Sequence, residues 1–241
     1  MKENAWEKLW NSRIVDVEHN SDSDKELFLE LKRGSGFDVM GEGITYDAFI
    51  EQHSIIDKML FPDRVKCQMD GEASVYEVGC GSGGNLFLFE KMGLQCGGID
   101  FSKSLIEAAK KILRSTDLTC AEADQIPQEP IYDALLSYGV FHYFSGEEYA
   151  YRVLEKMYHK TRFSIGLMDI HDKEKEQDFE DYRKATIEDY ENRYRNLPKT
   201  FYSKDFFRQF ASEHGMQIVF TESTLKGYWN NDFIFHCFLY K

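Results

Sequence analysis

A glycine-rich loop that directly follows a short apolar segment is the part of this sequence best suited to hold a small ligand. Residues 75–84 read VYEVGCGSGG, so Gly79, Gly81 and Gly83 alternate with other residues after the apolar run. Glycine adopts positive φ angles without steric cost, and its bare backbone lets a ligand approach closely. A helix predicted to begin near residue 83 offers unpaired N–H groups beside the same loop. The sequence therefore predicts a binding site for a small ligand at this loop.

Two carboxylates flank the loop and indicate what kind of ligand it holds. Asp100 ends the next predicted strand, where its carboxylate can accept both hydroxyls of a ribose. The glycine spacing fits a dinucleotide (G-x-G-x-x-G) as readily as a sulfonium nucleoside (G-x-G-x-G). Glu77, just before the glycines, repels a pyrophosphate but attracts an ammonium or a sulfonium. These charges favour an adenosine-bearing cation.

The elements around this loop alternate between short apolar strands and helices, which is typical of parallel β-α-β winding. Residues 1–70 precede this pattern and contain short helices and a glycine-rich break. Strands are expected at 74–79, 96–100, 117–121, 131–138, 162–169, 217–222 and 232–240, and helices at about 83–92, 102–113 and 146–158. The last two strands are joined by about ten residues, which favours an antiparallel pair.

Several helix ends carry recognisable capping residues. Ser23 and Ser145 are each followed three residues later by glutamate, which is the pattern of a capping box. Ser203 is expected to cap a helix that ends at Gly215.

The motif Glu77-x-Gly79-x-Gly81-x-Gly83 resembles the first motif of class I S-adenosylmethionine-dependent methyltransferases. The resemblance spans roughly residues 70–170, and the closing strands at 217–240 are consistent with it. It implies an α/β fold: a Rossmann-like, doubly wound, mostly parallel seven-stranded sheet with an antiparallel C-terminal strand, N-terminal helices and a helical lid insertion. It also implies S-adenosylmethionine as the cofactor and S-adenosylhomocysteine as the product, with no metal ion.

The same resemblance assigns roles to individual residues. Asp100 is expected to bind the ribose hydroxyls, with Phe101 and Ser102 beside the adenosine. Residues 121–127 are similar to the adenine loop of the family, and either Glu122 or Asp124 is the adenine partner. The residues expected to bind the cofactor are Glu77, Gly79, Cys80, Gly81, Gly83, Asp100, Phe101, Ser102, Glu122, Ala123, Asp124, Ser137 and Tyr138.

Methyl transfer from a sulfonium is an in-line displacement, so the protein mainly supplies alignment. Where the acceptor needs a base, histidine has a suitable pKa. His142 and His171 follow the fourth and fifth predicted strands, at the sheet edge where ligands bind, and are the catalytic candidates. The residues expected to contact the acceptor substrate are Tyr46, Tyr143 and Tyr228.

Composition narrows the function classes. Lys and Arg number 29 against 42 Asp and Glu, which gives a net charge of −13 and disfavours nucleic acid or an anionic membrane as a partner. The five cysteines form no C-x-x-C pair, and no stretch is apolar enough to span a bilayer, so a cytoplasmic location is expected. Residues 1–70 are expected to act as a helical cap and 71–241 as the cofactor-binding domain with a charged, lid-like insertion at 171–199, all within one structural domain.

The leading hypothesis is a methyltransferase that modifies an oxygen or nitrogen atom of a small metabolite. An NAD(P)-dependent oxidoreductase using the same loop is an alternative, disfavoured by Glu77 and by the lack of a Tyr-x-x-x-Lys pair. A non-catalytic module that binds S-adenosylmethionine is a third hypothesis, since fold and ligand site do not prove turnover.

Overall fold

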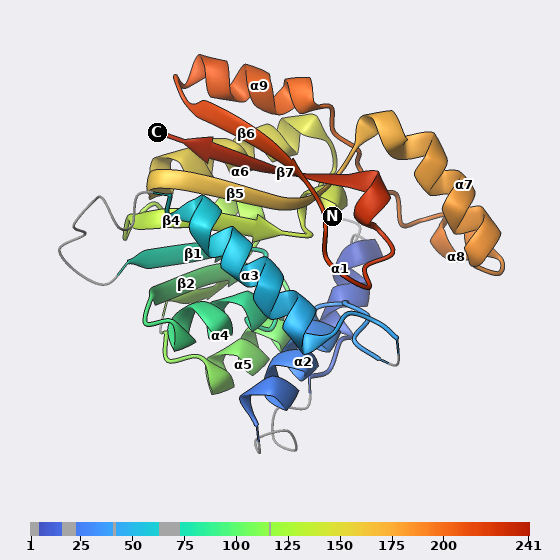
Figure 1. The fold of residues 1–241 in the computed structure, drawn as a ribbon, viewed down its shortest axis with the longest axis horizontal. Coiled ribbons are helices and arrows are strands. Elements are labelled where there is room, and N and C mark those ends of the chain that lie inside the picture. The colour runs from blue at the N-terminus through green and yellow to red at the C-terminus, as the bar shows by residue number, and fades with distance from the viewer. Residues whose placement is uncertain (1–4, 16–22, 41, 63–72, 116) are drawn as a thin grey trace.

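A single seven-stranded sheet lies at the centre of the molecule (Figure 1). The structure is a computed structural model that describes residues 5–15, 23–40, 42–62, 73–115 and 117–241. The strand order is β3-β2-β1-β4-β5-β7-β6. The strands are β1 (Ser74–Val78), β2 (Gln95–Asp100), β3 (Leu118–Cys120), β4 (Tyr132–Tyr138), β5 (Thr161–His171), β6 (Gln217–Glu222) and β7 (Ile234–Tyr240).

The first five strands pair in parallel, and β7 runs antiparallel to both of its neighbours, β5 and β6. The predicted doubly wound sheet with an antiparallel C-terminal strand is therefore confirmed. The order reverses between β1 and β4, because β2 and β3 lie on one side of β1 and the remaining strands on the other. In open α/β sheets, such a reversal creates the crevice in which ligands bind.

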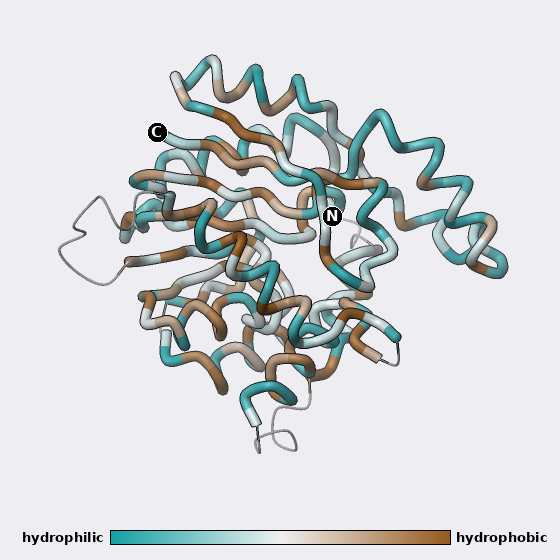
Figure 2. Tube along the Cα trace, viewed as in Figure 1, coloured by the Kyte–Doolittle hydropathy of each residue, from teal (hydrophilic) through white to brown (hydrophobic). Residues whose placement is uncertain are grey.

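Helices cover both faces of the sheet. On one face, α2 (Asp24–Gly34), α3 (Tyr46–Leu60), α4 (Gly84–Lys91) and α5 (Lys103–Ile112) share a core with the strands. On the other face, α6 (Glu147–Lys160) and α9 (Lys204–Glu213) form a second core. Figure 2 shows that the strands between these layers are predominantly apolar. The N-terminal helices α2 and α3 thus pack directly on the sheet.

The remaining helices are shorter or lie beside the sheet. They are α1 (Ala5–Asn11), α7 (Glu176–Thr186), α8 (Tyr190–Tyr194) and the 3-10 turns at Ala123–Gln125, Phe141–Tyr143, Lys173–Lys175 and Asn231–Phe233. The insertion after β5 is helical, as expected, and Figure 2 shows α7 to be largely hydrophilic. It is anchored by Phe179, which is buried against Phe201 and Phe233.

Two of the three predicted helix caps are confirmed. The hydroxyl of Ser23 accepts from the backbone N–H of Glu26, and that of Ser203 accepts from Phe206. The capping box at Ser145 is wrong: α6 begins one residue later, with Gly146 as a cap that makes no side-chain hydrogen bond. The N-cap position of α6 has a φ of 138°, which glycine adopts readily and serine does not. Gly146 therefore occupies the cap position in place of Ser145.

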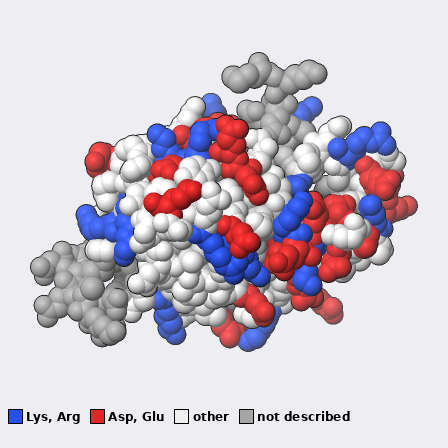
Figure 3. Space-filling model, turned by 90° about the horizontal axis from the view of Figure 1, so that it is seen from above, with Lys and Arg blue, Asp and Glu red and all other residues white. Residues whose placement is uncertain are grey.

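None of the described helices has the length and apolar character needed to cross a membrane. Cys80, Cys96, Cys120 and Cys237 are free thiols. Cys67 lies outside the described residues. Acidic and basic side chains are interspersed over the face shown in Figure 3, which presents no continuous basic patch.

Candidate active site

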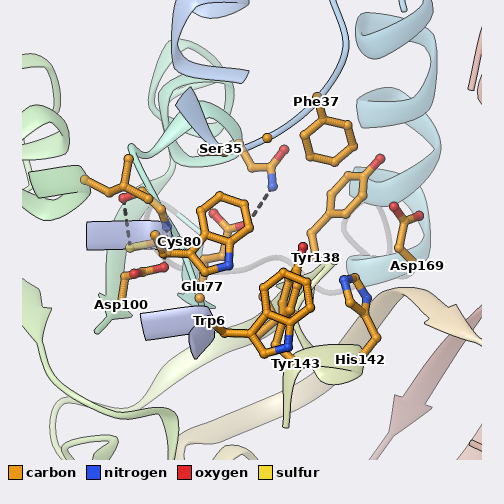
Figure 4. A pocket seen from close by; sticks show the side chains of 18 of the residues that line it. Trp6, Ser35, Phe37, Glu77, Cys80, Asp100, Tyr138, His142, Tyr143 and Asp169 are labelled. Atoms are coloured by element: carbon orange, nitrogen blue, oxygen red, sulfur yellow. Dashed lines mark hydrogen bonds between the residues drawn. The ribbon is translucent and has the colours of Figure 1, made fainter. Parts of the chain in front are cut away.

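A cavity of about 340 Å³ opens at the carboxyl ends of the central strands, where the strand order reverses (Figure 4). Its walls come from the glycine loop, the ends of β2, β4 and β5, the N-terminal helices, and the segment between β6 and β7. The lining residues that the sequence also predicted are Glu77, Gly79, Cys80, Gly81, Asp100, Phe101, Glu122, Ala123, Tyr138, His142, Tyr143 and Tyr228. The fold therefore brings members of both predicted sets, for cofactor and for acceptor, into one cavity, while several other predicted residues lie outside it.

The glycine loop has the backbone conformation that its sequence predicts. Gly79, Gly81 and Gly83 all have positive φ angles, of 75°, 53° and 83°. A Cβ atom at Gly79 would lie 2.3 Å from Cγ2 of Val140, so the loop leaves no room for a side chain there. Gly83 does not line the cavity: it is the N-cap of α4, and its missing side chain makes room for Leu113. Its role is to turn the chain into the helix.

Asp100 lies at the end of β2, beside the loop. Its two carboxylate oxygens accept hydrogen bonds from the backbone N–H groups of Gly81 (2.9 Å) and Ser102 (2.8 Å). Burial raises the pKa of Asp100 to about 6, although these two amides oppose the increase. Each oxygen can accept a further hydrogen bond, so the side chain is oriented to receive a diol.

Ser102 does not face the cavity, contrary to expectation. It is fully buried, and its hydroxyl accepts from the N–H of Leu105 as the N-cap of α5. The hydroxyl also donates to the backbone carbonyl of Trp10. Ser102 thus ties α1 to the sheet edge.

A buried polar network lies behind the glycine loop. The amide of Asn85 donates to Oε1 of Glu77 (2.5 Å), and its oxygen accepts from Nζ of Lys32 (2.6 Å). Burial raises the pKa of Glu77 and lowers that of Lys32, each to about 8, while the attraction between the two charges opposes both shifts. One carboxylate oxygen of Glu77, Oε2, has no hydrogen-bond partner among the described residues. The network therefore offers a ligand one hydrogen-bond acceptor, Oε2 of Glu77, and one ammonium group, that of Lys32.

The adenine side of the cavity favours one of the two candidates left open by the sequence. Glu122 and Ala123 line the cavity, whereas Asp124 does not. The carboxylate of Asp124 lies instead 3.8 Å from the guanidinium of Arg152. At the end of β4, Tyr138 lines the cavity and donates to Gln52, while Ser137 points away and donates to the carbonyl of Val78.

The two candidate catalytic histidines occupy different environments. His142 lines the cavity, and neither of its ring nitrogens has a hydrogen-bond partner in the described part of the chain. His171 is fully buried outside the cavity lining and stacks on His142, with ring centroids 4.4 Å apart. The prediction that His171 reaches the substrate is therefore wrong, because β5 turns its side chain into the core between Phe179 and Phe201. Burial lowers the pKa of both rings well below the usual value.

Two of the three predicted substrate contacts lie in the cavity. Tyr143 is covered by α1, since its ring packs edge-on against the rings of Trp6 and Trp10, with centroid distances of 4.6 and 5.5 Å. Tyr228 enters from the segment between β6 and β7. Tyr46 does not line the cavity and packs against Phe28 in the core.

Sequence reasoning missed several residues that line the cavity. They are Lys32, Asn85, Asp169, Lys199 and Asn230 among others. Asn85 follows the glycine motif closely and could have been proposed from its place on α4. Lys32, Asp169 and Asn230 come from segments distant in sequence, and no local pattern marks them.

The charged insertion contributes little to the cavity. Its last residue, Lys199, lines the wall, but no residue of α7 or α8 does. Within the described residues, no cluster of three or more His, Cys, Asp or Glu side chains could hold a metal ion.

Comparison with known proteins finds a similarity to a methyltransferase domain. A family model described as a methyltransferase domain matches residues 76–162. No curated protein sequence matches the chain significantly.

Several solved structures share the fold at low sequence identity. Magnesium protoporphyrin IX methyltransferase from Synechocystis PCC 6803, solved with bound S-adenosylhomocysteine, is 12% identical, with 88% of this chain and 93% of that chain covered and a TM-score of 0.60. The plantazolicin methyltransferase BpumL is 17% identical, with 97% and 96% covered and a TM-score of 0.60. DesVI from Streptomyces venezuelae is 12% identical, with 79% and 90% covered and a TM-score of 0.57.

Both the matched segment and the sheet topology agree with the resemblance carried by the glycine motif. The matched residues run from β1 to the start of β5, and so include the glycine loop, Asp100 and the end of β4. Residues 76–162 are therefore similar to a methyltransferase domain, and the chain has the fold of S-adenosylmethionine-dependent methyltransferases.

Proposed function

We propose that this protein transfers the methyl group of S-adenosylmethionine to an oxygen or nitrogen atom of a small metabolite. One observation carries the proposal: a single cavity presents the diol acceptor Asp100 beside the glycine loop and the Glu77, Asn85 and Lys32 network behind it. These groups match the two ends of a ligand that joins a ribose to a zwitterionic amino acid.

Each end of that ligand has a partner of suitable chemistry. Asp100 accepts the ribose hydroxyls, and Glu122, Ala123 and Phe101 line the adenine side. The free oxygen of Glu77 accepts from the ammonium of the methionine moiety, while Lys32 faces its carboxylate. Binding of a cation restores the charged form of Glu77, whose pKa burial raises to about 8.

The chemistry of the step requires alignment more than proton transfer. The bound donor supplies an activated methyl group on a sulfonium. The walls near Tyr138 and His142 then hold the acceptor in line with it, which excludes water and fixes the angle of approach. His142 is present as the neutral imidazole at physiological pH, because burial lowers its pKa, so it can accept a hydrogen bond from the acceptor.

A small acceptor suits a cavity of about 340 Å³, and the acidic surface opposes nucleic acid. The net charge is −13. The solved neighbours act on chemically different substrates, as the names of the protoporphyrin and plantazolicin enzymes state. Free thiols at four described cysteines favour a reducing compartment, so we place the enzyme in the cytoplasm.

The N-terminal segment, within residues 1–70, acts in this proposal as the cap of the site. Trp6 and Trp10 of α1 and Lys32 of α2 form part of the wall. The insertion at 171–199 reaches the cavity through Lys199, which lies over the rings of Tyr143 and Trp6. We infer that both segments contribute to the choice of acceptor.

Calorimetric titration with S-adenosylmethionine, S-adenosylhomocysteine and NAD(P) tests the cofactor. We expect the first two to bind and the dinucleotides not to bind. Tight binding of NAD(P) alone would support an oxidoreductase instead.

Turnover is tested separately with methyl-labelled donor and a metabolite extract. A labelled small product is expected, and substitution of His142 by alanine should lower kcat while donor affinity stays within about threefold. Donor binding without any labelled product would identify a non-catalytic binding module.

A further inference from the structure

Asp169, near the end of β5, has an unusual backbone conformation. Its φ angle is 58°, and it lies where the register between β5 and β7 shifts, between Leu167 and Ile170. A non-glycine residue with a positive φ is strained, and such residues concentrate at functional sites. The irregularity turns a side chain of the strand towards the cavity, which Asp169 lines.

The carboxylate of Asp169 is buried without adequate partners. Only 1% of the residue is exposed, and neither oxygen has a hydrogen bond of normal geometry in the described part of the chain. Burial raises its pKa to about 7, and the nearby Tyr228 hydroxyl, Lys32 and Lys199 offset this only in part. Burying a carboxylate without a hydrogen-bond partner costs free energy, so its presence at the cavity wall favours a role in binding a ligand.

Asp169 lies at the end of the cavity opposite Asp100, next to Tyr138 and His142 (Figure 4). A Cβ atom at Gly139 would lie 4.0 Å from Oδ2 of Asp169, so this glycine leaves space in front of the carboxylate. Oδ1 of Asn230 and both ring nitrogens of His142 also lack partners among the described residues. Hydrogen-bond acceptors predominate at this end, so a ligand there must donate hydrogen bonds.

The charge of the whole cavity points in the same direction. Five carboxylates but only two ammonium groups belong to its described lining. Lys32 is bonded to Asn85 and, in the proposed function, faces the carboxylate of the donor. Burial lowers the pKa of Lys199 to about 7, so this amine is only partly protonated at neutral pH. The rings of Trp6, Tyr143 and Trp229 add faces that attract cations.

We propose that Asp169 binds the ammonium form of an amine acceptor and takes its proton, so that the protein is an N-methyltransferase. This inference rests on the proposed function. One N–H proton moves to Oδ1 or Oδ2 of Asp169, and the freed lone pair of the nitrogen attacks the methyl carbon. The carbon–sulfur bond breaks, its electron pair stays on sulfur as a neutral thioether, and the methylated nitrogen becomes the new ammonium.

Probe binding tests the inference without knowledge of the natural acceptor. The full-length protein is saturated with S-adenosylhomocysteine, and binding of benzylamine is compared with binding of the neutral isostere benzyl alcohol. We expect the amine to bind about ten- to a hundredfold more tightly, as a buried hydrogen bond to a charged group implies. Asp169→Asn should remove this preference, because the amide is neutral and tolerates a positive φ.

Asp189→Asn is the matched control. Among the described residues, Asp189 is the other non-glycine residue with a positive φ (56°). It lies at the start of α8, outside the cavity lining. The Asp189→Asn variant should still bind benzylamine more tightly than benzyl alcohol. Equal binding of both probes by the wild-type protein, including no detectable binding of either, overturns the inference, as does an unchanged preference in Asp169→Asn.

Turnover on a panel of primary amines and their matched alcohols provides the second measurement. Label should appear on amines only, and Asp169→Asn should lower kcat by about 10²- to 10⁴-fold. Transfer to alcohols alone contradicts the inference. Failure of the wild-type protein to bind S-adenosylhomocysteine at all refutes the proposed function instead, so the two failures are distinguishable.

Discussion

The two ends of the cavity are built in different ways. At the donor end, Asp100 is held by two backbone amides that belong to its own strand end and to the adjacent glycine loop. At the acceptor end, Asp169, His142 and Asn230 converge from three separate segments, and each has a side-chain polar atom that finds no partner among the residues the structure describes. The first end is preorganised by the protein itself, whereas the second depends on a ligand to satisfy it.

This difference shows how one fold can serve many acceptors. The donor end is assembled by local chain geometry, which tolerates little change. The acceptor end is assembled by loops and strand irregularities around a rigid sheet, where substitutions alter specificity more than folding. Substitutions at the two ends should therefore change different quantities.

The largest effect is expected at the glycine loop. Gly79→Ala places a Cβ atom against Val140 at a φ of 75°, so it should weaken donor binding by more than about a hundredfold and lower the melting temperature. Gly93→Ala is the control, because Gly93 has a φ of 86° but nothing within 4 Å of the added atom. Calorimetry and thermal unfolding measure both variants. Equal losses in the two would mean that backbone strain, and not the close approach at the loop, explains the effect.

Asp100→Ala should have the next largest effect on the donor. Loss of hydrogen bonds to a charged acceptor costs about 1.5–3 kcal/mol, which weakens donor binding about 10- to 150-fold. The affinity of the acceptor-end probe in the presence of saturating donor product should change little. Unchanged donor affinity in calorimetry would remove Asp100 as the ribose partner.

The sequence pointed to most of the residues that line the Asp100 end of the cavity, because the determinants of this end are local. Glu77 and the three loop glycines occur within one strand and its turn, and Asp100 follows at the end of the next strand. Alternation of apolar strands with helices was sufficient to predict the parallel pairing of the first five strands. The boundaries differ by only a few residues, and Ser145 fails as a cap because Gly146 makes the turn.

The acceptor end was predicted poorly because its determinants are tertiary. His171 and Asp169 lie two residues apart on β5, so a regular strand would direct them to the same face. The irregularity between Leu167 and Ile170 sends Asp169 to the cavity while His171 remains in the core. Nothing in the apolar run of β5 indicates such a shift, and Lys32 likewise reaches the site only through the packing of α2.

Asp169→Asn should stabilise the apo protein in a pH-dependent way. The pKa of Asp169 rises from 3.8 to about 7 on folding, so its ionisation opposes folding; this cost is absent below about pH 4 and complete above about pH 7. The variant should therefore gain about 4 kcal/mol over the wild-type protein as the pH rises from about 4 to about 7. Urea unfolding of both proteins across this range measures the difference, and Asp189→Asn should show none.

Other ionisable groups also face Asp169. They are Lys32 on α2, Lys199 after α8, Tyr228 before β7, and His142 and His236 on the adjoining segments. These groups titrate in both the wild-type protein and Asp169→Asn, so their contributions cancel to first order when the two proteins are compared at the same pH. A difference that shrinks as the pH rises would mean that Asp169 is stabilised by ionisation and has an adequate partner.

The smallest effect is expected at the adenine side, where it decides between two neighbouring acids. Glu122 lines the cavity and Asp124 does not, so Glu122→Gln should weaken donor binding by about three- to tenfold while Asp124→Asn leaves it unchanged. Both changes remove one negative charge from the same 3-10 turn region, so long-range electrostatics cannot account for a difference between them. A loss in Asp124→Asn alone would mean that the turn rearranges when the donor binds. The donor end would then share the dependence on ligand that distinguishes the acceptor end.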